Sequence, residues 1–141
     1  MFALLKKQVL VNVDLKDPSE LTAIAKVASF AGEKLDLASQ TLRSGFLASE
    51  ASGAQIFSGH IALTHASSAD LKKPEIVIVN FAAPIAWGEA SQVDTVIAVI
   101  VPESDDTDAV MNTVQGNLEG LTGEFTQGLT AGALEKVRRQ L

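Results

Sequence analysis

Residues 50–66 read E-A-S-G-A-Q-I-F-S-G-H-I-A-L-T-H-A, residues 72–81 read K-K-P-E-I-V-I-V-N-F, and residues 84–88 read P-I-A-W-G. Two strand-like runs lie in this part of the chain and a third follows it: Ile61 to His65, Glu75 to Phe81, and Thr95 to Val101. The last two are apolar and rich in β-branched residues at nearly every position, which is typical of strands covered on both faces. The sequence therefore predicts a buried sheet with helices on its two sides.

A further strand and a helix are predicted near the start of the chain. Gln8 to Asp14 is rich in valine, as strands are. The run Asp17-Pro18-Ser19-Glu20 has the pattern of a helix start, with Asp17 as the N-cap acceptor, proline at the first helical position and glutamate three residues after the cap. Apolar residues then recur at helical spacing as far as Gly32, where we expect this helix to end.

Three more helices are expected. The second spans about Asp36 to Gly53, and the third follows Pro102, where acidic residues favour a helix N-terminus ahead of an apolar face. The last runs from about Ala131 to Leu141, with Thr130 as a possible cap. This order predicts an α/β fold: a single domain over residues 1–141, with a mixed β-sheet flanked by helices on both faces (an α/β/α sandwich).

Composition narrows the classes of function. The chain has 141 residues, a formal net charge of −6 and no cysteine. Scattered basic residues on an acidic chain argue against nucleic-acid binding, and the lack of cysteine excludes disulfides and thiolate metal sites. No apolar run approaches the roughly 20 residues of a membrane helix, and no signal peptide is visible. We expect a cytoplasmic protein without direct membrane insertion.

His65 is the candidate nucleophile. The chain has two histidines and no thiol, and an imidazole with a pKa of about 6.5 is largely neutral and nucleophilic near pH 7. His65 is expected at the end of a short strand, just before a polar turn, Ala66-Ser67-Ser68. A strand end would hold the ring firmly, and the small residues of the turn would leave room for a partner and supply hydrogen-bond donors.

His60 is interpreted as a structural or rim residue. It lies five residues before His65, and an odd separation along a regular strand places two side chains on opposite faces. Two histidines alone would also be an incomplete ligand set, so we expect neither a metal nor a cofactor. The sequence contains no G-x-S-x-G, P-loop, G-x-G-x-x-G or H-E-x-x-H motif.

These segments resemble the active-site region of the IIA components of the bacterial phosphotransferase system (PTS), fructose/mannitol type. That family shows R-E-x-x-x and a turn rich in serine and threonine, then G-x-G-I-A-I-P-H with the histidine as phosphoryl carrier. K-P-x-I, P-I-x-W/F-G and an apolar strand ending in V-P follow. Residues at matching positions without gaps are Glu50, Gly53, Ile61, Ala62, Leu63 and His65. Lys73-Pro74, Pro84-Ile85, Trp87-Gly88 and Val101-Pro102 follow in the same order. The similarity covers nearly the whole chain.

The resemblance implies a phosphocarrier. His65 would accept a phosphoryl group from the histidine protein HPr and pass it to a IIB component, which drives sugar uptake and phosphorylation. Glu50, Thr64, Ser67 and His60 are the expected supporting residues. Phosphoryl transfer needs an in-line nucleophile and donors for the equatorial oxygens, and either ring nitrogen could be that nucleophile.

The chain departs from the family pattern at several positions. Ser49 stands where the family has an arginine, and Thr64 replaces the proline before the histidine. The helix after Val101-Pro102 offers carboxylates and Thr107 in place of a second histidine. Ser67, Ser68, Thr64 and His60 are expected to supply donors instead, and Arg43 is expected to reach in from the second helix. These losses keep a second hypothesis open, a IIA-like regulatory module in which phosphorylation of His65 switches binding to a regulator or transporter.

Overall fold

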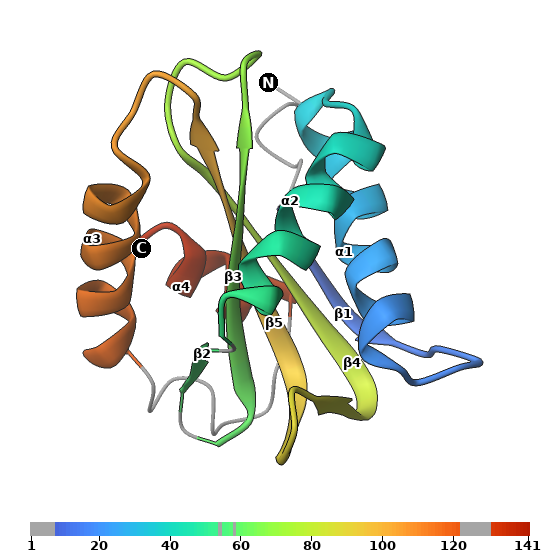
Figure 1. Ribbon diagram of the computed structural model, residues 1–141. Helices are drawn as coiled ribbons and strands as arrows, with labels where there is room; N and C mark the ends of the chain where they lie inside the picture. Colours follow the sequence, from blue (N-terminus) through green and yellow to red (C-terminus); the bar gives the residue numbers. More distant parts are fainter. Residues whose placement is uncertain (1–7, 54, 58, 122–130) are drawn as a thin grey trace.

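The computed structural model of the protein describes residues 8–53, 55–57, 59–121 and 131–141 (Figure 1). In chain order its elements are β1 (Val9–Val13), α1 (Glu20–Leu35), α2 (Ser39–Ala51), β2 (Gln55–Phe57), β3 (Ile61–Ser68), β4 (Glu75–Trp87), β5 (Ser91–Pro102), α3 (Thr107–Glu119) and α4 (Ala131–Arg138). The strands form one five-stranded sheet in the order β1-β4-β5-β3-β2. The sheet is mixed, since β1 is parallel to β4 and β3 is parallel to β5, whereas β4–β5 and β2–β3 are antiparallel.

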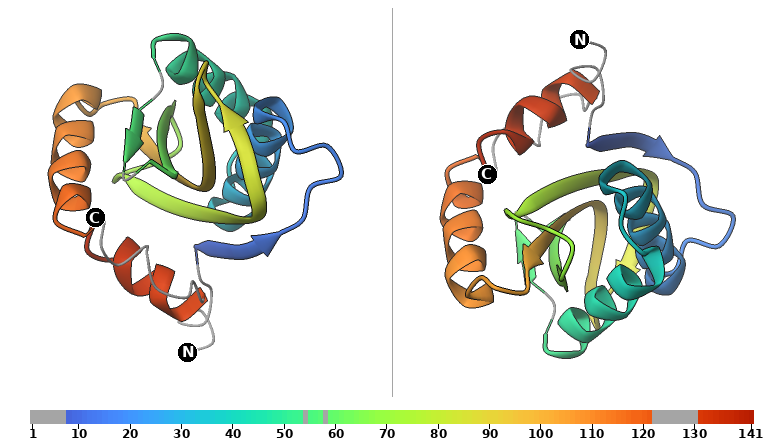
Figure 2. Two further views of the ribbon diagram at one scale, coloured as in Figure 1. Left: turned by 90° about the horizontal axis from the view of Figure 1, so that it is seen from below. Right: turned by 90° about the horizontal axis from the view of Figure 1, so that it is seen from above.

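Helices cover both faces of the sheet, which confirms the predicted α/β fold. One apolar cluster joins α1 and α2 to the sheet through residues such as Ile24, Phe46 and Val79. A second cluster, on the other face, joins α3 and α4 to it through Leu118, Leu134 and others. Figure 2 shows this layering, with each pair of helices on its own side of the strands. The nearly continuous apolar runs of β4 and β5 follow directly from burial on two faces.

Two predictions about strands were wrong. Ala66, Ser67 and Ser68 do not form a turn, because β3 continues in register with β5 from Ile61 opposite Thr95 to Ser68 opposite Pro102. His65 therefore lies inside a strand and not at its end. The short strand β2 was not predicted, since three residues are too few to show a period in the sequence.

The helix ends also differ from the sequence prediction. Ser19, and not Asp17, caps α1: its side chain accepts a hydrogen bond from the Thr22 amide, while Asp17 bonds to the Ser19 and Thr22 hydroxyls. The helix runs past Gly32 and stops at Asp36, which adopts the left-handed conformation with φ 56°. The second helix accordingly begins at Ser39 rather than near Asp36.

A close approach between α2 and β3 depends on Gly45. A Cβ atom added at Gly45 would lie 2.6 Å from the Cβ of Ala66 and 3.0 Å from its Cα. Two small residues thus bring the axis of α2 unusually near the strand that carries His65. Gly45, inside the helix, is therefore a packing contact.

The C-terminal helix α4 is tied to the first strand. Glu135 is buried, accepts a hydrogen bond from the Gln8 amide at 3.3 Å, and pairs with Arg138 and Arg139 on its own helix. Thr130, the cap expected for α4, lies outside the described residues. Within the described part of the chain, no helix is both long and apolar enough to cross a membrane.

Candidate functional site

His65 lies on β3 at the point where its edge is no longer covered by β2. The strand β2 pairs only with Ile61 to Leu63, and α2 lies beside the next part of β3. Because side chains alternate along a strand, His65 shares the face of Leu63, which packs in the α3–α4 cluster. The ring is therefore half-buried between the last turns of α2 and the first turns of α3.

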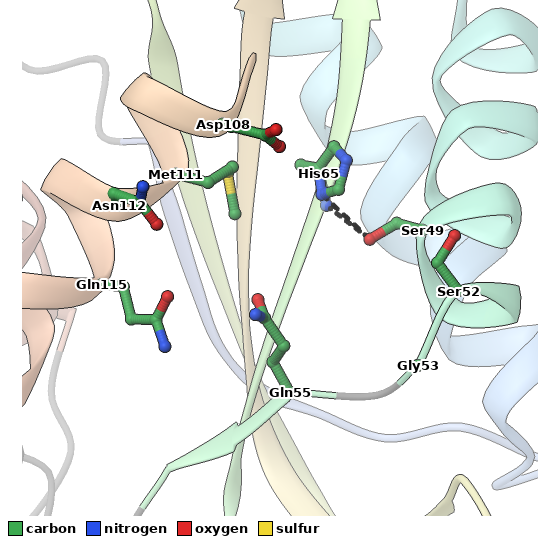
Figure 3. A pocket seen from close by; sticks show the side chains of 9 residues that line it. All are labelled: Ser49, Ser52, Gly53, Gln55, His65, Asp108, Met111, Asn112 and Gln115. Carbon is green, nitrogen blue, oxygen red and sulfur yellow. Dashed lines mark hydrogen bonds between the residues drawn. The ribbon is translucent and has the colours of Figure 1, made fainter.

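A cavity of about 440 Å³ opens beside this ring (Figure 3). Its lining residues are mostly neutral and polar: Ser49, Ser52, Gly53, Gln55, His65, Asp108, Met111, Asn112 and Gln115. They come from α2, β2, β3 and α3, so the cavity exists only in the folded chain. No lysine or arginine is among these residues, and Asp108 is the one carboxylate.

Ser49 holds the imidazole of His65. Its Oγ lies 3.0 Å from Nδ1, and the same oxygen accepts a hydrogen bond from the His65 backbone amide at 3.4 Å. Figure 3 shows the hydroxyl directed at the ring from the end of α2. Among the described residues, none forms a hydrogen bond with Nε2. One ring nitrogen is thus engaged and the other is available.

Burial sets the protonation state of His65. Loss of hydration lowers the pKa of the imidazole below its usual 6.5, and the charge of Asp108 acts weakly in the opposite direction. A lowered pKa means that the ring is neutral at pH 7 and keeps a lone pair on one nitrogen. This is the protonation state that a nucleophilic histidine needs.

A second cavity, of about 380 Å³, lies between α2 and the second half of β3. It is lined by Ser67 and Ala66 of β3 together with Thr41, Gly45, Ala48, Ser49 and Ser52 of the α2 segment. His65 lines both cavities, so its ring can be reached from two directions. Of the expected supporting residues, Ser67 lines this cavity together with His65.

Glu50 and Thr64 lie behind the site, on the other face of β3. Glu50 accepts a hydrogen bond from Trp87 Nε1 at 2.7 Å, and its Oε2 is buried without a hydrogen-bond partner among the described residues. Burial raises the pKa of Glu50, and the hydrogen bond from Trp87 partly offsets this. The Thr64 hydroxyl also reaches the Phe46 carbonyl at 3.5 Å. Both residues therefore fasten α2 to the sheet and do not line the cavity.

His60 and Arg43 are also away from the cavity. His60 precedes β3, and its Nδ1 lies 2.9 Å from Asp94 Oδ1, which fits the structural interpretation of this residue. Arg43 is exposed and lines a separate cavity between α1 and α2 with Ala25 and Ala28, so the expectation that it reaches His65 was wrong. Ser68 points to the same face as Thr64 and bonds to the Asp70 amide. The described residues contain no cluster of three or more potential metal ligands.

Several residues around His65 were not singled out in the sequence. Gln55, Asn112 and Gln115 bring carboxamides to the cavity. The sequence indicates for Ser49 only the loss of the family's arginine, and no role beside the ring. The helical spacing of Asp108, Asn112 and Gln115 does place them on one side of α3. That signal could not be used, because nothing in the sequence shows that this side faces β3.

The fold and the site define an α/β protein with a half-buried, anchored histidine at a sheet margin. Residues 3–116 match the family model for the phosphoenolpyruvate-dependent sugar phosphotransferase system, EIIA 2. This chain belongs to that family, and it is a phosphotransfer component of the PTS IIA kind. No curated protein sequence matches it.

Solved structures with the same fold are remote in sequence. The nitrogen regulatory protein IIA-Ntr from Neisseria meningitidis is 15% identical with a TM-score of 0.70, over 95% of this chain and 98% of that one. A putative PTS IIA domain from Streptococcus pyogenes is 13% identical with a TM-score of 0.68, over 98% and 93%. Enzyme IIAMtl from Escherichia coli, in complex with phosphorylated enzyme IIBMtl, is 12% identical with a TM-score of 0.66, over 93% and 94%.

Proposed function

We propose that this protein is a cytoplasmic phosphocarrier of the fructose/mannitol type, with residues 1–141 as one IIA domain. His65 accepts a phosphoryl group from phospho-HPr and passes it to a IIB component. The observation that carries the proposal is the state of the His65 ring: half-buried, neutral at pH 7, anchored at Nδ1 and open to two cavities.

The reaction transfers a phosphoryl group from one imidazole nitrogen, on the donor protein, to another, on His65. A lone pair of the His65 imidazole attacks the phosphorus of the donor's phosphohistidine. The bond from phosphorus to the donor ring breaks, and its electron pair returns to the donor nitrogen. Transfer to the IIB component repeats the exchange with the His65 ring as the leaving group. Positioning and hydrogen bonding to the phosphoryl oxygens are what the protein has to supply.

In this site, neutral side chains donate the hydrogen bonds to the phosphoryl oxygens. The carboxamides of Asn112, Gln115 and Gln55 line the cavity beside the ring and carry N–H groups suited to phosphoryl oxygens. Asp108 opposes them, because a carboxylate near a doubly charged phosphoryl group is repulsive. A site without a cation should form its phosphohistidine less completely at equilibrium than one that contains an arginine.

The test is labelling by radioactive phospho-HPr, followed by transfer to a panel of IIB proteins. The wild-type chain should take up one acid-labile, base-stable label, and His65→Ala should take up none. His60→Ala is the matched control, since it removes the other histidine at a site outside the cavity. Label retained in His65→Ala, or lost in a folded His60→Ala, would refute the assignment.

Transfer of the label to IIB proteins distinguishes a phosphocarrier from a regulatory module that phosphorylation only switches. A carrier passes its label to at least one IIB protein quickly compared with spontaneous hydrolysis. A label that forms on His65 but is not passed to any IIB protein would support the regulatory module instead. Failure of phospho-HPr to label the folded wild-type protein would remove both functions.

A further inference from the structure

We propose that Ser49 is the positioning residue of the phosphoryl site. Its Oγ accepts a hydrogen bond from Nδ1–H of His65 and so reserves the Nε2 lone pair for phosphorus. This inference rests on the proposed phosphocarrier function and deepens it, because it assigns a role to the residue that replaces the family's arginine.

A serine hydroxyl has one hydrogen to donate and two lone pairs to accept with. The His65 backbone N–H occupies one lone pair of Ser49 Oγ. The 3.0 Å contact with Nδ1 must then use either the remaining lone pair or the hydroxyl hydrogen.

The two possibilities differ in reactivity. If Ser49 donated to Nδ1, the neutral ring would carry its proton on Nε2, and its single lone pair would already be engaged by the hydroxyl. Neither nitrogen could then attack phosphorus. If Ser49 accepts from Nδ1–H, the lone pair lies on Nε2, which has no hydrogen-bond partner among the described residues. Only this second tautomer gives a reactive ring.

The backbone fixes Ser49 where this bond can form. Ser49 lies in the last turn of α2, one turn after Gly45, whose contact with Ala66 holds α2 against β3. Ala66 directly follows His65 on that strand. The distance from Ser49 to the ring is thus set by two packed elements, and such support holds reacting groups in position.

The hydrogen bond from His65 Nδ1–H to Ser49 Oγ strengthens during transfer. As the Nε2 lone pair forms the bond to phosphorus, the ring becomes an imidazolium that retains its proton on Nδ1. The bond from that N–H to Ser49 Oγ then becomes charge-assisted and stronger than in the resting protein. A contact that strengthens as charge develops accelerates the step.

The first test needs no phosphoryl donor. Nitrogen-15 NMR of the unphosphorylated protein at about pH 8, where the ring is neutral, reports which nitrogen of His65 carries the proton. We expect the proton on Nδ1 in the wild type and a shift toward Nε2–H in Ser49→Ala. Ser44→Ala is the matched control, because Ser44 is an exposed serine on the same helix and should leave the tautomer unchanged.

The second test measures transfer from phospho-HPr under single-turnover conditions. Loss of one hydrogen bond that is stronger in the transition state should slow labelling of Ser49→Ala about tenfold, and Ser49→Thr should restore much of the rate. Ser44→Ala should label at the wild-type rate, and the label should be attached to Nε2.

The outcomes separate the two proposals. An Nε2–H tautomer in the wild type, a label on Nδ1, or an unchanged tautomer in Ser49→Ala would overturn the role of Ser49, even if labelling of His65 is normal. An unlabelled wild-type protein whose tautomer still depends on Ser49 would refute the phosphocarrier function and leave the hydrogen bond established.

Discussion

The contact between Gly45 and Ala66 gives the sharpest stability prediction. Gly45→Ala adds a methyl group whose carbon would lie 2.6 Å from a side-chain carbon and 3.0 Å from a backbone carbon of β3. Neither atom is the end of a flexible side chain, so the helix and the strand must separate. The same separation would lengthen the contact from Ser49 to the His65 ring.

Two opposing contributions determine how much Gly45→Ala changes the free energy of unfolding. Alanine favours a helix interior over glycine by about 1 kcal/mol. Overpacking a close contact typically costs about 1–3 kcal/mol, and a clash with backbone belongs in the upper part of that range. Gly45→Ala should therefore lower the free energy of unfolding by about 1–2 kcal/mol.

Gly116 provides the matched control. It also lies inside a helix, α3, but a Cβ added there meets nothing within 4 Å. Gly116→Ala should raise the free energy of unfolding by about 0.5–1 kcal/mol, through helix propensity alone. Urea unfolding followed by circular dichroism should separate the midpoints of the two variants by about 1 M. If Gly45→Ala is stabilised as much as Gly116→Ala, the close approach of α2 and β3 is wrong.

Three further perturbations test the charges and the buried polar contacts. Asp108→Asn should lower the His65 pKa further and increase the labelled fraction at equilibrium, because it removes a carboxylate beside the ring; an NMR titration showing a higher pKa would contradict this. Trp87→Phe should cost about 1–3 kcal/mol in urea unfolding, since it leaves both carboxylate oxygens of the half-buried Glu50 without a partner; a loss as small as that of an exposed substitution would count against the bond. Glu135→Gln should destabilise the fold at pH 7 and progressively less as the pH falls below 4.5, because the neighbouring arginines lower the pKa of Glu135 and its contribution is lost as it protonates; equal destabilisation at pH 7 and about pH 3 would refute this.

The sequence located the strands better than their ends. Apolar β-branched runs placed β4 and β5 because burial on both faces imposes that composition. The polar end of β3 resembled a turn, since Ala66, Ser67 and Ser68 have little strand propensity. Pairing with β5 overrides that propensity, and such pairing is not visible in local sequence.

The residues expected to support His65 also depend on strand pairing that local sequence does not show. Glu50 and Thr64 were expected near the ring from their positions in the family pattern, yet they lie on the opposite face of β3. Thr64 adjoins His65 in the chain, and neighbouring strand residues point to opposite sides of a sheet. That rule would have excluded Thr64 from the cavity if His65 had been recognised as lying within a strand.

The sequence alone determined a sheet covered on both faces, the family, and the histidine that is the candidate nucleophile. These follow from composition and from the order of motifs, which need no tertiary structure to be recognised. Only the packed chain decided what surrounds that histidine. Ser49, Asp108 and Asn112 come from helices far apart in sequence. Their meeting depends on how closely each helix approaches β3, and that distance is set by side-chain volumes across the contact, such as a glycine facing an alanine.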